Sequence, residues 1–382
     1  MDHYNITAGY SDETEDILRS MFPEGPADLS AEDDVAEAVK KAAELDEYPA
    51  FHEGLAERLN QLGISCTLND TEIMLEEIKN RFRTILGKSC PRAVKNWIKG
   101  TTPGLTNHLN NYDICYALEM DTEQTESFFQ KCFLTLPWNC KNKTDAVFLY
   151  CFHHRKPYSD VKIMLEETEC FVSQKNAHTS TSQIMTDIIS ENDDEKFLKY
   201  LSAHCYDNQQ QFQTAKNIIK TEIENVKEKI RNNPASDIIS PERLNSNVIA
   251  ELLGYRYQID VSSRNSTHSL KRLPKRFTES LPNDVTIGKI INDETVSYET
   301  LRKTLILLKL YTFYYEAENT DETVITQNLM DFRDELNSVL SNCGFACIYP
   351  LHPFDNLVLY CAYSYDPILT MRQINEYGFI ST

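Results

Sequence analysis

The sequence predicts an all-α protein, and three observations lead to that prediction. Apolar residues recur three and four positions apart along most of the 382-residue chain, which is the period of helices with one buried face. Strand-like alternation is confined to one short stretch, CGFACIYPL at 343–351. Only 11 residues are glycine, which suits helices better than the tight turns of sheet proteins.

In the first half of the chain, capping and stop residues mark where helices begin and end. Ser30 is an expected N-cap, and Gly63 is an expected stop. Asp121 and Gln124 have the spacing of a capping box, in which each side chain bonds to the other residue's backbone. The helices expected here span 29–48, 48–63, 70–86 and 121–133.

In the second half, two segments rich in Pro, Ser and Asn interrupt the helical periodicity. Leu301, Leu305 and Leu308 share one face of an expected helix. The interruptions fall at 231–242 and 260–277, and the first is the expected domain boundary. The helices expected here span 195–205, 208–231 and 297–316.

An internal repeat relates two stretches of the chain. DAVFLYCFHHRKPYSDVKI begins at Asp145 and DNLVLYCAYSYDPILTMRQ begins at Asp355, an offset of 210 (355 minus 145). The offset holds without a gap as far as Pro157 and Pro367. We expect two related helical modules. The alternative is that two amphipathic helices merely share Leu-Tyr-Cys core chemistry.

The charge is distributed unevenly along the chain, whose formal net charge is -20. Residues 1–50 contain 14 acidic and 3 basic residues, whereas residues 78–100 contain 7 basic residues and no acidic one. The negative net charge argues against nucleic-acid binding over the whole surface, whereas the basic stretch allows it on one local face. No stretch is long and apolar enough to span a membrane, and the N-terminal residues, without a basic and an apolar region, do not predict a signal peptide. The scattered cysteines indicate reduced thiols and a cytoplasmic protein.

We find no constellation of residues that indicates an enzyme, a cofactor or a metal. No glycine-rich phosphate loop occurs, and no hydroxyl or thiol has a base at a spacing that would activate it. His153 and His154 are adjacent on an expected helix and therefore point in different directions, without a further ligand nearby. We expect no catalytic residues, no metal site and no cofactor.

The most informative stretch is CPRAVKNWIKG, residues 90–100, which predicts a short helix with two distinct faces. Pro91 suits its first turn, where no backbone donor is needed. An apolar face is formed by Val94, Trp97 and Ile98. The opposite face carries the candidates for contact with base edges, since Arg pairs with guanine and Asn with adenine. These candidates are Pro91, Arg92, Lys95 and Asn96.

Further cations on this helix, the preceding helix and the turn are candidates for phosphate contacts, which fix register rather than sequence. They are Lys79, Arg81, Arg83, Lys88 and Lys99.

The stretch from 80 to 129, beginning NRFRTILGKSCPRAVKNWIKG, resembles the Cro-type (Xre-type) helix-turn-helix family of phage repressors over about residues 78–130. The resemblance implies a turn at Leu86 and Gly87 and a recognition helix with Val94 and Trp97 inside. The positions that complete the pattern are Gly100, Pro103, Ala117, Leu118 and Asp121. One departure is Arg83, which stands where the family has a small residue; either the alignment slips or the two helices are splayed.

The resemblance and the spacing together imply four segments. They are an acidic helical segment (1–68), a helix-turn-helix module (69–135), a helical domain (136–235) and a second helical module (236–382), a degenerate repeat of 80–170 that has lost its tryptophan and its cations.

We expect a bacterial, sequence-specific regulator of transcription that binds double-stranded DNA as a homodimer, with a helical remainder that dimerises or senses an unidentified effector. In one hypothesis the acidic residues 1–50 compete with phosphate for the basic face. The alternative is a non-enzymatic helical adaptor, in which the basic helix binds an acidic protein and never meets DNA.

Overall fold

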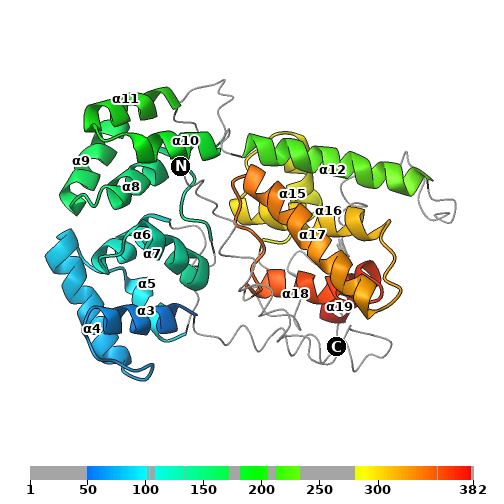
Figure 1. Cartoon of the computed structure of the whole chain (residues 1–382), viewed down its shortest axis with the longest axis horizontal. Helices are drawn as coiled ribbons and strands as arrows, with labels where there is room; N and C mark the ends of the chain where they lie inside the picture. Colours follow the sequence, from blue (N-terminus) through cyan, green and yellow to red (C-terminus); the bar gives the residue numbers. More distant parts are fainter. Residues whose placement is uncertain are drawn as a thin grey trace, which may run out of the picture. The chain divides into compact units, whose positions relative to one another are not determined.

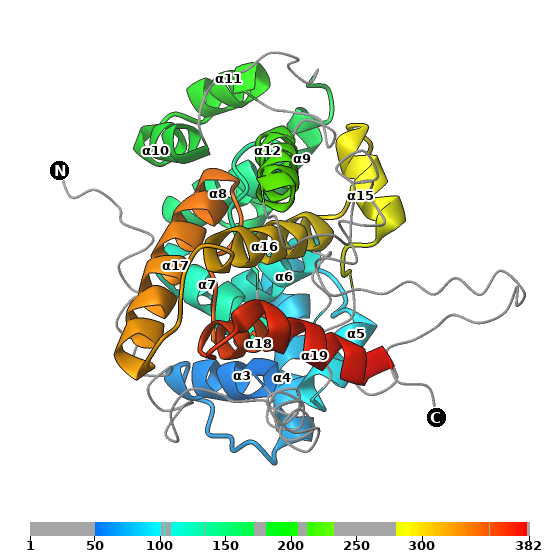
Figure 2. The ribbon, with the colours of Figure 1, turned by 90° about the vertical axis from the view of Figure 1, so that its right-hand side faces the viewer.

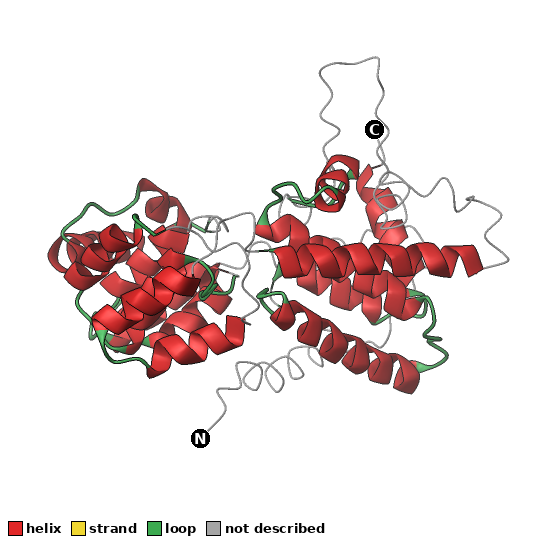
Figure 3. Ribbon diagram, turned by 90° about the horizontal axis from the view of Figure 1, so that it is seen from above, coloured by secondary structure: helices red, strands yellow, loops and turns green. Residues whose placement is uncertain are grey.

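The computed structural model describes residues 50–100, 103, 108–133, 135–171, 181–204, 212–232, 280–350 and 352–379. Within these ranges the regular elements are helices and no strand occurs, which confirms the all-α class (Figure 3). The expected helix at 29–48 and the acidic segment before it lie outside the described residues. None of the described helices has both the length and the apolar character needed to cross a bilayer.

The described residues divide into two compact units, with the boundary between 211 and 212 (Figure 1). By their described residues we call them the N unit (50–204) and the C unit (212–379). The segment 136–235 was expected to include the helix that ends at residue 232, but this helix packs within the C unit. The division into two units therefore differs from the four expected segments.

The N unit is a set of helices around one apolar core. Its helices are α3 (Ala50–Gln61), α4 (Thr71–Arg81), α5 (Arg92–Ile98), α6 (His108–Ala117), α7 (Thr122–Phe128), α8 (Lys143–His153), α9 (Tyr158–Thr168), α10 (Thr181–Ser190) and α11 (Asp194–His204). Two π-helical segments, η2 (Phe82–Leu86) and η3 (Phe129–Phe133), continue α4 and α7. The capping box of Asp121 and Gln124 is present at the start of α7, as the sequence predicts.

Trp97 connects α5 to the core of the N unit. Its ring lies 5.5 Å from that of Phe51 in α3 and 6.4 Å from that of Phe133 in η3, measured between centroids. Only 6% of Trp97 is exposed. Burial of an aromatic side chain of this size fixes the rotation of α5 about its own axis, so the opposite face of the helix must point outward.

The C unit is organised around one helix that is buried on almost every side, α16. Its helices are α12 (Gln213–Asn232), α15 (Asp284–Ile291), α16 (Tyr298–Tyr314), α17 (Glu322–Asn342), α18 (Pro353–Ala362) and α19 (Pro367–Phe379). Figure 2 shows α16 among α12, α17, α18 and α19, and it contacts all four. Leu301, Leu305 and Leu308 are fully buried in the core, as their spacing predicts.

The one strand candidate forms a loop where it is described, at residues 343–350. Side chains, rather than a partner strand, satisfy its backbone. The Tyr298 hydroxyl accepts from the Ala346 N–H at 2.9 Å, and Asn337 accepts from the Ile348 N–H at 2.8 Å. The Arg302 guanidinium donates to the carbonyls of Ala346 and Cys347, both at 3.0 Å. These side chains, distant in the sequence, supply the hydrogen bonds that a partner strand would make. The alternation of apolar residues therefore predicted a strand that does not form.

The repeat found in the sequence falls on matching places in the two units. Helices α8 and α18 have their N-caps 210 residues apart, at Asn142 and His352 (352 minus 142). Asp145 and Asp355 are both buried, and each accepts a backbone N–H from the residue six positions earlier, at 3.1 Å and 2.8 Å respectively. The matching N-caps and the matching buried hydrogen bonds favour an internal duplication over the alternative that two helices merely share core residues.

Helices α5 and α15 also correspond, at an offset of 193 (287 minus 94). Val94 and Trp97 match Ile287 and Ile290, and all four are buried. Each helix is followed by a residue with positive φ, Gly100 at 95° and Asp293 at 60°. At the positions that match Arg92, Lys95, Asn96 and Lys99, α15 has Val285, Gly288, Lys289 and Asn292. The counterpart helix thus keeps the buried face and lacks most of the cations.

The His352 cap makes the stability of the C unit depend on pH. Burial lowers the pKa of His352 below its ordinary value of 6.5, against the opposing effect of Asp355 and Glu299, with Arg302 and Lys303 also nearby. As the pH decreases, His352 is therefore protonated in the unfolded chain at a higher pH than in the folded chain. The free energy of unfolding consequently falls as the pH decreases below about 6.5. We expect His352→Asn, which copies the cap at Asn142, to lose less stability between pH 7 and pH 5 in urea unfolding. Parallel losses in the two proteins would contradict this.

Candidate nucleic-acid interface

Helix α5 is presented by a turn whose backbone conformation depends on glycine. The π-helical segment η2 ends at Gly87, which has φ 66° and is therefore left-handed, a conformation that costs a residue with a Cβ about 1–2 kcal/mol. Pro91 precedes α5 as its N-cap, with φ -57° and ψ 139°. The predicted helix, the predicted turn at Leu86 and Gly87, and the proline at the helix start are all present.

The two predicted faces of α5 are also present. Val94, Trp97 and Ile98 are buried. The side chains of the opposite face, which we call the basic stripe, are exposed and make no hydrogen bond or ion pair with any described residue; they are Arg92, Lys95, Asn96 and Lys99. Their spacing of three and four places them on one side of the helix. Pro91 is half-buried beside the stripe.

Two of the other cations remain accessible beside the stripe. Lys79 is exposed and has no side-chain partner among the described residues. Arg83 is exposed and donates one hydrogen bond, to the Asn80 side chain at 2.9 Å. Since Arg83 points to solvent, it does not occupy the crossing of α4 and α5 where the resemblance would place a small residue. The helix is π-helical from Phe82 to Leu86, a local change often found at functional sites.

Arg81 is a different case, because its charge is used inside the protein. Its guanidinium lies 2.9 Å from Glu77 and 2.6 Å from Glu119. Two carboxylates already surround this side chain, so the structure places it in an intramolecular network rather than in the phosphate role that we expected.

Lys88 is also held inside the N unit. Its ammonium donates to the Asp113 carboxylate and, at 2.6 Å, to the Tyr158 hydroxyl. Asp113 is only 1% exposed. Removing Lys88 from this carboxylate to bind a phosphate would leave a buried charge without its partner, which is costly. Lys88 is therefore a poor phosphate contact, and the sequence could not show it because its partners are 25 and 70 residues away.

The turn contains one cysteine, Cys90, which is half-buried. Burial raises the pKa of Cys90 to about 11, so the thiol is protonated at neutral pH. The described cysteines are free thiols, and most are buried, as expected. Among the described residues, no group of acidic, His and Cys side chains is placed to hold a metal ion.

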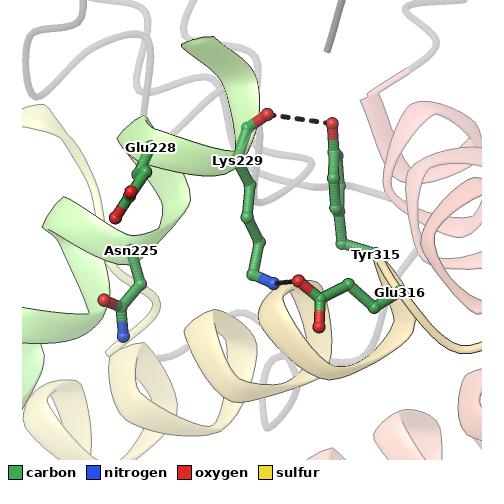
Figure 4. Close-up of a pocket in the computed structure, with 5 residues that line it drawn as sticks. All are labelled: Asn225, Glu228, Lys229, Tyr315 and Glu316. Atoms are coloured by element: carbon green, nitrogen blue, oxygen red, sulfur yellow. Dashed lines mark hydrogen bonds and ion pairs between the residues drawn. The ribbon is translucent and has the colours of Figure 1, made fainter. Parts of the chain in front are cut away.

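The C unit has a polar pocket of 390 Å³ between α12 and the end of α16, shown in Figure 4. Asn225, Glu228, Lys229, Tyr315 and Glu316 line it. Lys229 bonds to Glu316, and the Tyr315 hydroxyl donates to the Lys229 carbonyl at 3.0 Å. Because Lys229 is already paired with Glu316, the pocket offers a ligand less positive charge than the basic stripe does.

Comparisons of the chain with protein-family models, with curated proteins and with solved structures find no match. The resemblance to the Cro-type helix-turn-helix family consequently stays a prediction.

Proposed function

We propose that this protein is a sequence-specific DNA-binding regulator that reads double-stranded DNA with helix α5. The observation that carries the proposal is the basic stripe: three cations and an amide, exposed and without partners among the described residues, on a helix fixed by a buried tryptophan. A helix of this kind fits the major groove, where Arg and Asn pair bidentately with bases.

Phosphate contacts would come from the flanking cations that the fold leaves accessible. Lys79 and Arg83 lie on the preceding helix, and Lys99 lies at the end of α5. These side chains would fix the register of α5 on the duplex. A helix of seven residues contacts few bases, and the corresponding helix α15 lacks most of the stripe. We therefore propose a homodimer that places two copies of α5 on half-sites one helical turn apart.

The decisive experiment is retention of genomic fragments by the purified chain, with an empty matrix as the control. We expect sequencing of the retained fragments to show one shared site with two-fold symmetry. Affinity for that site should fall linearly with salt on logarithmic axes, with a slope of about -0.9 for each phosphate contact. Retention no greater than that of the empty matrix would refute the proposal.

A second candidate function is an adaptor whose basic stripe binds an acidic protein segment. The charge distribution favours it, since residues 1–50 contain 14 acidic residues, all of them before the described part of the chain. An adaptor would show no shared DNA site, and its salt dependence would be shallower than that of a duplex-binding protein.

A further inference from the structure

The turn before α5 has little backbone bonding of its own. The Gly87 and Lys88 N–H groups both donate to the Phe82 carbonyl, the second at 3.2 Å. For Ser89 and Cys90, no backbone partner of the N–H occurs among the described residues, and Pro91 has no N–H. Residues 87–91 therefore need side chains from elsewhere to set the direction in which α5 leaves.

A trio of polar groups, in which Asp113 and Tyr158 are buried and the Lys88 side chain is 32% exposed, supplies the first such connection, to α6 and α9. The Tyr158 hydroxyl donates to Asp113 at 2.6 Å and lies 2.6 Å from the Lys88 ammonium, which also bonds to Asp113. Burial, and then the bond to Asp113, raise the pKa of Tyr158, so its hydroxyl keeps its proton. Each of the three side chains is hydrogen-bonded to the other two, so the trio favours a single arrangement of the turn, α6 and α9.

Lys162, one turn further along α9, supplies the second connection. Its ammonium donates to the Leu86 carbonyl at 3.0 Å, at the end of η2. The ammonium groups of Lys162 and Lys88 lie 5.2 Å and 5.0 Å from the centre of the Tyr158 ring, within the range of cation–π attraction. Both flanks of Gly87 are thus tied to the same tyrosine and the same helix.

We propose that Tyr158 and Lys162 are positioning residues for α5: they hold the turn at 87–91 and so set the direction of the basic stripe. The consequence for DNA binding depends on the proposed function, whereas the restraint on the turn does not. Helix α9 lies outside the segment 69–135 expected to form the module, so the recognition helix depends on residues beyond the helix-turn-helix itself.

The chain contains a matched control for this trio in the same unit. The Tyr150 hydroxyl donates to Asp194 at 2.7 Å, the Lys156 ammonium bonds to Asp194 at 2.8 Å, and that ammonium lies 5.5 Å from the Tyr150 ring. This second trio joins α8 to α11 and includes no residue of the turn. Tyr150→Phe, like Tyr158→Phe, removes a tyrosine hydroxyl that donates to an aspartate, but it does so away from the turn.

The first readout is hydrogen exchange of the full-length chain at the amides of residues 87–95. We expect Tyr158→Phe and Lys162→Met each to speed exchange there by about tenfold, because one net hydrogen bond is lost. Tyr150→Phe should leave these amides unchanged. Lys88→Met should behave like Tyr158→Phe, and Lys88→Arg should restore slow exchange. Equal effects of Tyr158→Phe and Tyr150→Phe on the turn would overturn the proposal.

The second readout is affinity for the shared site, measured where every variant is fully folded. Tyr158→Phe should weaken binding to that site more than binding to unrelated duplex, and Tyr150→Phe should change neither. A loosened turn with unchanged affinity would overturn the positioning role. If the wild-type chain retains no DNA, the proposed function fails by itself, and hydrogen exchange still decides whether Tyr158 and Lys162 hold the turn.

Discussion

Replacing Arg92 and Lys95 together by alanine is expected to lower the affinity for the shared duplex site by about 100-fold or more, since each lost base contact costs about 1–3 kcal/mol. The stability of the fold should not change. Both side chains are exposed and neither has a partner among the described residues, so their removal breaks no contact of the protein that the structure shows. Fluorescence titration with the labelled site measures the affinity, and thermal unfolding checks the fold.

The matched control for this variant lies on α11 of the same unit. Lys196 and Lys199 are exposed and have the same spacing of three, so replacing both by alanine removes the same charge from the N unit. If binding depends on the basic stripe, this control should change affinity only slightly. Equal losses in the two double variants would show that net charge alone attracts the duplex, and would contradict recognition by α5.

Replacing Asp355 by asparagine is expected to destabilise the C unit by about 3–5 kcal/mol, because it breaks a buried ion pair and leaves a guanidinium uncompensated. Arg302 donates to both Asp355 oxygens, at 2.8 Å and 2.7 Å, and the two residues are 3% and 0% exposed. Burial alone would raise the pKa of Asp355, but the Arg302 guanidinium more than offsets this and holds the pKa below its usual value. Urea unfolding followed by circular dichroism measures the loss.

The corresponding aspartate of the N unit provides the comparison. Asp145 accepts the same type of backbone bond, but the basic side chain paired with it is the His108 imidazole, at 3.6 Å and 26% exposed, rather than a buried guanidinium. Asp145→Asn should therefore cost less than Asp355→Asn. Both tryptophans, Trp97 and Trp138, belong to the N unit, so tryptophan fluorescence reports on Asp145→Asn. A larger loss for Asp145→Asn would contradict the assignment of the Arg302 pair as the stronger one.

Local pattern predicted the helices and their faces well, because periodicity and capping are properties of neighbouring residues. Val94, Trp97 and Ile98 are buried as their spacing indicates, and Asp121 and Gln124 form the capping box. The repeat at 210 residues also falls on matching buried positions in the two units. These features need no knowledge of which distant segments meet.

Local pattern did not predict which cations are exposed and which are paired with carboxylates of the protein. Seven cations between 78 and 100 are equivalent in the sequence, yet Arg81 and Lys88 are bound to carboxylates of the fold. The loop at 343–350 and the division of the chain between 211 and 212 also depend on contacts that are distant along the chain. The Glu77 pair of Arg81 has the i,i+4 spacing of a helix and is visible in the sequence. Spacing gives no signal for the other contacts, because their partners are brought close only by packing of whole helices.

By itself, then, the sequence determined that this protein is helical, which face of α5 is apolar, and that a cluster of cations precedes and includes that helix. Only the tertiary structure decided which cations stay free for a partner. A charge becomes available or is neutralised according to the side chains that folding places within a few ångströms of it. For Lys88 those side chains are Asp113 of α6 and Tyr158 of α9, 25 and 70 residues away, and for Arg81 one of them is Glu119, 38 residues away.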